Sequence, residues 1–203
     1  MYRVLVSAIA AALCSAALFG TATATPKLKQ TPKAASSPRP SPSPAPVPGS
    51  AVGLLTWQYN DFVGTKPDVG ASACLIPLRA TKVVADDAKG VMLDAHLGID
   101  TTINKYGWVC GKADGSGAVN LDAVPPGTYT ALVISEKTTR NFKAPLSDLE
   151  LQILGFRFDP DAVRIVTMEP SVLLLRQWSF VSTIVVRSGT VSHFSYDFGH
   201  TYF

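Results

Sequence analysis

The stretch "KADGSGAVNLDAVPPGTYTALVIS", Lys112 to Ser135, decides the fold. It begins with a turn rich in glycine and aspartate, continues as a short alternating segment, Val119, Leu121 and Ala123, and turns again at two prolines and a glycine. An apolar face of Tyr129, Ala131 and Val133 follows. Alternation with a period of two, interrupted by turn residues, predicts β-strands that place one face on a core and the other in water.

The same period recurs on both sides of this stretch. Leu55, Trp57 and Tyr59 share one face of "GLLTWQY", and Phe194, Tyr196 and Phe198 share one face near the end of the chain. The segment "RSGTV" at 187–191 reads as a hairpin turn between the last two strands. With about seven such strands, the sequence predicts an all-β, antiparallel, immunoglobulin-like β-sandwich.

Two regions depart from this period. The first, between Lys82 and Lys105, includes a short helical pattern. The second, at 143–178, is predicted as a helical insertion before the last hairpin, with Pro145 in the first turn of a helix and an apolar face at helical spacing made of Leu146, Leu149, Ile153 and Phe156. We expect this insertion to cover an edge or an open end of the sandwich.

The N-terminal quarter of the chain has the composition of an export signal and a tether. Arg3, an apolar run and Ala22-Thr23-Ala24 predict a signal peptide over 1–24; the alternative is a permanent membrane anchor. No later segment is apolar and long enough to form a span. Residues 25–50 carry eight of the fifteen prolines and predict a disordered, semi-extended tether, with a PxxP-type ligand or a wall-crossing stalk as alternatives. The domain is expected over 51–203.

The charge balance argues against nucleic acid as a partner. Of the 18 basic residues, one lies in the signal peptide and four in the tether, which leaves 18 − 1 − 4 = 13 against 15 acidic residues from position 51 onward. The domain therefore has no basic excess for a phosphate backbone. The basic tether could contact an anionic envelope surface.

Two cysteines, Cys74 and Cys110, remain after removal of the signal peptide. An even pair in an exported protein predicts a disulfide, although two separate buried thiols are the alternative. Closing a loop of this length stabilises a fold by roughly 3–4 kcal/mol in the chain-entropy model.

The residues that could carry chemistry form no recognisable active site. Asp114 and Ser116 begin a calcium-loop spacing that the following residues do not continue, so a turn is the better interpretation of "KADGSG". His193, Ser195 and Asp197 share a strand face, but nothing marks a nucleophile turn or an oxyanion hole. We therefore expect no catalytic residues, no metal site and no cofactor.

A stacking platform could be formed by the aromatic residues Trp57, Trp108 and Trp178 together with the ending "FSYDFGHTYF". The alternative is that Trp57 and Trp108 face the core beside the disulfide.

The strand and turn pattern, with "VPPGTYT" at its centre, resembles the carboxypeptidase regulatory-like domain, a transthyretin (prealbumin)-like β-sandwich found in exported bacterial proteins. The resemblance covers roughly 51–78, 106–140 and 178–203. It implies an accessory role. The hydrolytic branch of this fold ends in "YRGS", which this chain lacks.

We therefore expect a secreted, non-enzymatic module that binds a protein or saccharide at the cell envelope, or serves there as a structural element. One alternative is a small secreted hydrolase on the same scaffold, and another is an assembly subunit that pairs through a strand edge.

Overall fold

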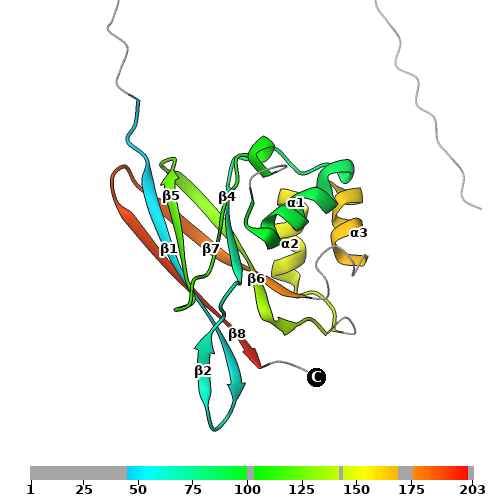
Figure 1. The fold of residues 1–203 in the computed structure, drawn as a ribbon. Helices are drawn as coiled ribbons and strands as arrows, with labels where there is room; N and C mark the ends of the chain where they lie inside the picture. The colour runs from blue at the N-terminus through cyan, green and yellow to red at the C-terminus, as the bar shows by residue number, and fades with distance from the viewer. Residues whose placement is uncertain (1–44, 100–102, 142–143, 169–175, 201–203) are drawn as a thin grey trace, which may run out of the picture. The chain divides into compact units, whose positions relative to one another are not determined.

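A computed structural model describes residues 45–99, 103–141, 144–168 and 176–200. The predicted signal peptide, most of the tether and parts of the predicted insertion lie outside these ranges. The described chain forms two β-sheets and a layer of helices (Figure 1). The predicted β-sandwich with a helical insertion is confirmed.

The first sheet is built around the long strand β1 (Gly49–Asn60). One edge of β1 pairs with β5 (Ala118–Val124) in its first half and with β2 (Gly64–Pro67) in its second half. Its other edge pairs with β8 (Val191–His200), and this pairing is parallel, whereas every other strand pair is antiparallel among the described residues. The first two residues of β1, Gly49 and Ser50, belong to the predicted tether, so the domain begins slightly earlier than expected.

The second sheet has the order β4-β3-β6-β7, and its central strands β3 and β6 are buried on both faces along most of their length. Its strands are β3 (Ser72–Pro77), β4 (Val109–Lys112), β6 (Gly127–Thr139) and β7 (Arg176–Val186). In β6, Tyr129, Ala131 and Val133 pack against the first sheet, as predicted, while Leu132 and Ile134 pack against the helices. A strand covered on both sides has few polar positions.

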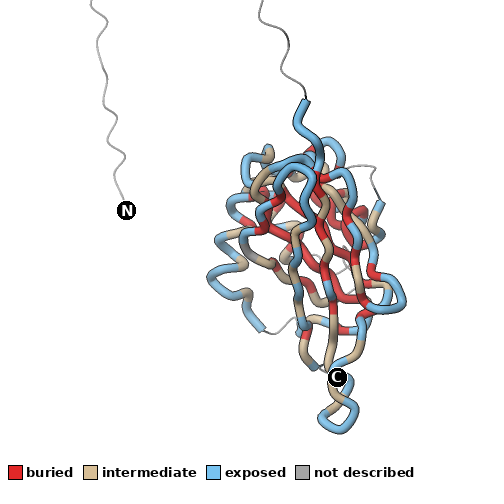
Figure 2. The backbone as a smooth tube through the Cα atoms, turned by 90° about the vertical axis from the view of Figure 1, so that its left-hand side faces the viewer, coloured by how far each residue is buried: buried red, intermediate tan, exposed pale blue. Residues whose placement is uncertain are grey.

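The helices cover the outer face of the second sheet, so the expectation that they cap an edge or an open end is wrong. They are α1 (Ala85–Leu97), the short η1 (Ile103–Tyr106), α2 (Asp148–Arg157) and α3 (Pro160–Met168). Met92, Leu154 and Phe158 pack from this side against Ile76 and Leu132 of the sheet. Figure 2 shows the buried residues concentrated along the strands and the exposed ones in the loops and outer turns.

Helix α2 forms within the predicted region, but it begins at Asp148, so Pro145 precedes the helix and does not lie in its first turn as predicted. The helix also buries a different face from the predicted one. Ser147 caps its N-terminus, and the Ser147 side chain and Glu150 form a reciprocal capping box. Of the predicted apolar face, Leu146 and Ile153 pack on the core, whereas Leu149 and Phe156 are exposed, and Leu154 is fully buried instead. The two faces are offset by one residue, a rotation of about 100° about the helix axis, and periodicity alone does not distinguish them.

The turn at 187–191 is not a hairpin, because it carries the chain from one sheet to the other. Strand β7 pairs with β6, and β8 pairs with β1. The turn at Pro125 and Pro126 also crosses between sheets, from β5 to β6. Before it, an irregularity in the β1–β5 pairing leaves Ala123 exposed at a φ of 55°, so Val124 enters the core in place of the predicted Ala123.

The segment "KADGSG" is a turn, as predicted, and it too connects the two sheets. The Asp114 carboxylate accepts hydrogen bonds from the Ser116 amide, the Ser116 hydroxyl and the Ala118 amide. These bonds lower the pKa of Asp114. An internally satisfied carboxylate of this kind is typical of an Asx turn.

A substitution at Gly117, the last residue of this turn, can test the geometry of the turn. Gly117 has a φ of 81°, and its carbonyl accepts a 2.9 Å hydrogen bond from the Leu55 amide. A Cβ atom at this position would lie 2.5 Å from the Leu55 carbonyl oxygen. We expect Gly117→Ala to lower the free energy of unfolding by about 2–3 kcal/mol. The alanine would be strained by the left-handed backbone conformation, and its Cβ atom would also clash with the Leu55 carbonyl oxygen.

The matched control is Gly115→Ala in the same turn, where a Cβ atom meets nothing within 4 Å. Urea unfolding of the two variants should differ clearly, with Gly115→Ala within about 0.5 kcal/mol of the wild type. Equal stabilities would contradict the described turn.

Candidate binding surface

The two predicted cysteines face each other across neighbouring strands. Cys74 of β3 is directly opposite Cys110 of β4, with Cα atoms 4.0 Å apart and sulfur atoms at disulfide-bonding distance. Cys74 is fully buried, and both residues belong to the core on the helical side. The pair therefore connects the edge strand β4 to the centre of the second sheet.

The three polar residues considered as a catalytic set all lie on the exposed face of β8. His193, Ser195 and Asp197 alternate with the inward Phe194, Tyr196 and Phe198, as the period predicted. The Asp197 carboxylate accepts a hydrogen bond from the Gly199 amide, and no described hydrogen bond joins the three side chains. They line an open strand face.

A second polar cluster surrounds His96 at the end of α1. Its Nε2 atom lies 4.0 Å from Glu136, whose carboxylate also accepts a 2.9 Å hydrogen bond from Arg176. Burial lowers the pKa of His96, against the attraction of Glu136. The neutral imidazole therefore packs at the edge of the core, where Arg176 is the charged partner of Glu136.

The tryptophans do not form a common platform. Trp108 and Trp178 are buried in the core beneath the helices, and the Trp108 ring packs edge-on against Phe158. Trp57 is half-buried against the core between the two sheets, so the prediction that it lies beside the disulfide is wrong. The exposed aromatic surface lies elsewhere, on the β1–β2 hairpin.

We call the hairpin from Trp57 to Lys66 the arm; it projects beyond the two sheets (Figure 1). The Tyr59 ring packs edge-on against Trp57 at a centroid distance of 5.5 Å, and the Lys66 ammonium lies 4.4 Å from its centre. At the turn, Asn60 Oδ1 accepts hydrogen bonds from the amides of Phe62 and Val63. The arm is thus held in one conformation by its own contacts.

The base of the arm is fixed to the second sheet by Asp68. Its carboxylate accepts hydrogen bonds from the Ser135 hydroxyl and the Glu136 amide of β6, and its own amide donates to the Leu55 carbonyl. Burial raises the pKa of the Asp68 carboxyl, while the hydrogen bonds to the carboxylate oppose this rise. Movement of the arm relative to the sandwich would break this connection.

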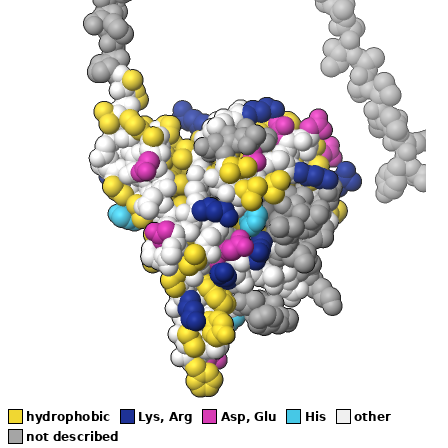
Figure 3. All heavy atoms as spheres, in the orientation of Figure 1, with side chains coloured by type: hydrophobic (Ala, Val, Ile, Leu, Met, Phe, Trp, Pro, Cys, Tyr) yellow, Lys and Arg dark blue, Asp and Glu magenta, His cyan; other side chains and the backbone are white. Residues whose placement is uncertain are grey.

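The tip of the arm exposes apolar side chains. Phe62 is 100% exposed, and Val63 and Tyr59 are each about half exposed. Hydrophobic side chains cover the end of this projection in Figure 3. The Asp61 side chain beside Phe62 is 85% exposed and lies 3.6 Å from His200 Nε2.

Phe62 was not predicted as a functional residue from the sequence, although the segment "YNDFVGT" contains an indication of its exposure. An aromatic and a branched apolar residue occupy a turn, where small and polar residues are usual.

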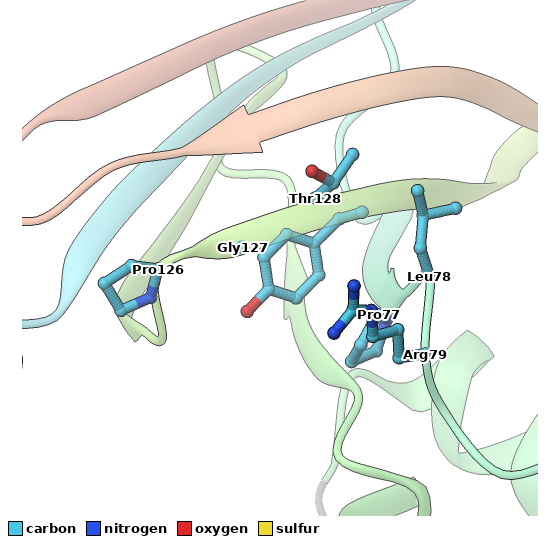
Figure 4. Close-up of a pocket in the computed structure, with 7 residues that line it drawn as sticks. Pro77, Leu78, Arg79, Pro126, Gly127 and Thr128 are labelled. Carbon is cyan, nitrogen blue, oxygen red and sulfur yellow. The ribbon is translucent and has the colours of Figure 1, made fainter.

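A cavity lies at the opposite end of the sandwich from the arm. It has a volume of about 500 Å³ and is lined by Pro77, Leu78, Arg79, Pro126, Gly127, Thr128 and Tyr129. In Figure 4, Pro126 lies on one side, while Leu78 and Arg79 lie on the other. The Arg79 side chain has no ion pair with any described residue.

Hydrogen bonds stabilise the residues that line this cavity. The buried Arg157 guanidinium donates hydrogen bonds of 3.1 and 3.0 Å to the carbonyls of Pro77 and Leu78. The Tyr129 hydroxyl donates to the Pro125 carbonyl at 2.6 Å. These contacts fix the positions of the Pro77 and Leu78 backbone and of the Tyr129 ring, which line the cavity.

Within the described ranges, no group of three or more histidine, cysteine or acidic residues is arranged to hold a metal ion. The described helices are all too short or too polar to cross a membrane. No family model, no curated protein and no solved structure matches the chain. The resemblance to the carboxypeptidase regulatory-like domain stays a prediction.

The cysteine pair generates a direct test. Peptide mapping without reductant should find the peptides that contain Cys74 and Cys110 linked, and reductant should lower the free energy of unfolding by about 3–4 kcal/mol. The double variant Cys74→Ala/Cys110→Ala should be less stable by a similar amount and insensitive to reductant. Alkylation of two free thiols in the unfolded, unreduced chain would contradict the bridge.

Proposed function

We propose that this chain is an exported, non-enzymatic β-sandwich module at the cell envelope that works by binding a protein partner through the arm. The observation that carries the proposal is the fully exposed Phe62 at the tip of a projection whose turn is stabilised by hydrogen bonds to Asn60. An exposed aromatic side chain gains free energy when a partner buries it, roughly 1.5–3 kcal/mol for a whole Phe side chain.

The surroundings of Phe62 favour a protein as the partner over a saccharide. Protein interfaces centre on a few aromatic anchors enclosed by a polar rim. Here the charged residues of the arm are Asp61, which adjoins Phe62, and Lys66, which lies over the Tyr59 ring. Saccharides stack on open ring faces, whereas the Tyr59 ring already has Lys66 over its face and Trp57 at its side.

A non-enzymatic role is supported by the open, flat surroundings of the exposed histidines. His193 lies on a strand face, and His200 lies near Asp61 beside the arm. Export is supported by the predicted signal peptide and by the cysteine pair at disulfide-bonding distance, which is typical of oxidising compartments.

Site-specific photo-crosslinking tests the arm as the contact. A benzophenone amino acid replaces Phe62 in one variant and Phe156 in the control, since Phe156 is also an exposed phenylalanine, 63% accessible, on α2. In intact envelopes we expect a discrete crosslinked species from position 62 alone. Excess wild-type chain should reduce the yield of this crosslinked species by competition, whereas excess Phe62→Ala chain should not. Equal products from both positions, or none from position 62, would contradict the proposal.

A further inference from the structure

The tip of the arm and the cavity are chemically complementary. Phe62 is an apolar knob, and Pro77, Leu78 and Pro126 form the apolar part of a cavity lining that also includes the polar Arg79 and Thr128. An apolar cavity of about 150 Å³ accommodates a benzene ring in a protein. The cavity, at about 500 Å³, therefore has room for the Phe62 ring and for the neighbouring Val63.

Their charges are complementary as well. Asp61 adjoins the knob and keeps 85% of its side chain accessible. Arg79 lines the cavity and has no acidic partner among the described residues. Insertion of Phe62 would bring an unlike pair of charges together at the rim, which favours the correct register over other dockings.

The two surfaces lie at opposite ends of one molecule, so they cannot meet within it. Gly49, at the start of β1, pairs with Val124, two residues before Pro126 of the cavity. The arm continues from the other end of β1, whose 12 residues span about 35–40 Å. An arm can therefore reach a cavity only on another chain.

We infer that the partner of the arm is a second copy of this chain, whose cavity receives Phe62 in a head-to-tail contact. This inference rests on the proposed function, that the arm is the binding element. Because the contact joins unlike surfaces, every assembly keeps a free arm at one end and a free cavity at the other, and repetition produces open linear chains. Both surfaces are preformed, by Asn60 on the arm and by Arg157 behind the cavity, which reduces the entropic cost of the contact.

Sedimentation velocity of the chain, expressed from its full-length sequence, tests the contact across a wide concentration range. We expect the sedimentation coefficient to rise with concentration. Phe62→Ala and Arg79→Asp should each weaken self-association about tenfold or more, as hot-spot substitutions do, while Phe156→Ala should not change it. Asp61→Arg should weaken association too, and combining it with Arg79→Asp should restore much of the loss.

Mixing two defective variants distinguishes a head-to-tail contact from a symmetric one. Phe62→Ala retains an intact cavity, and Arg79→Asp retains an intact arm. At concentrations where each variant alone is monomeric, a mixture of the two should form a one-to-one dimer that grows no further. A symmetric contact between two arms would not be rescued in this way.

Several results would overturn the inference. They are a chain that is monomeric at every concentration, association that Phe62→Ala leaves unchanged, and a failure of the mixed variants to pair. If the chain is monomeric but Phe62 crosslinks to a different protein, the proposed function stands and the self-contact is wrong. Cosedimentation of a monomeric chain with phosphatidylglycerol vesicles, lost in Phe62→Ala, would also reject the self-contact and identify a membrane as the target.

Discussion

The structure depends on the burial of both faces of the sheet β4-β3-β6-β7. Along β3, Ala73 and Leu75 face the first sheet, whereas Cys74 and Ile76 face the helices. Strand β6 repeats this division along most of its length. Burial of apolar area on both sides of one sheet gives a domain of modest size a large core, at roughly 25 cal/mol for each Å² removed from water. Neither the first sheet nor the helical layer is dispensable, because each covers an apolar face that water would otherwise reach.

The period-two pattern predicted most strands and their inward residues, since Leu55, Val119, Tyr129 and Phe198 all lie in the core. Sequence could not predict strand pairing, because a turn such as 187–191 has the same composition whether it closes a hairpin or crosses between sheets. The parallel pairing of β8 with β1 joins strands far apart in the sequence, so it could not be predicted from the local pattern.

The helical layer and the arm show two further features that could not be predicted from the sequence. The buried face of α2 follows from the sheet beneath it, so local periodicity put Leu149 and Phe156 in the core when the structure leaves them exposed. Phe62 was missed because alternation identifies residues that lie inside a fold, and an aromatic residue in a turn has no period. The cysteine pair was accessible to prediction, because only two cysteines remain after the predicted signal peptide and they can pair only with each other within the chain.

Native-state hydrogen exchange tests the central claim, that the second sheet needs both of its covers, most directly. The account predicts that amides of Leu132 and Val133 in β6 exchange through the same global opening as those of the inner turns of α1 and of Leu55 in β1. The arm should open at a much lower free energy. Exchange of α1 through a low-energy opening that leaves β6 fully protected would contradict the account, since the sheet would then be stable without its helical cover.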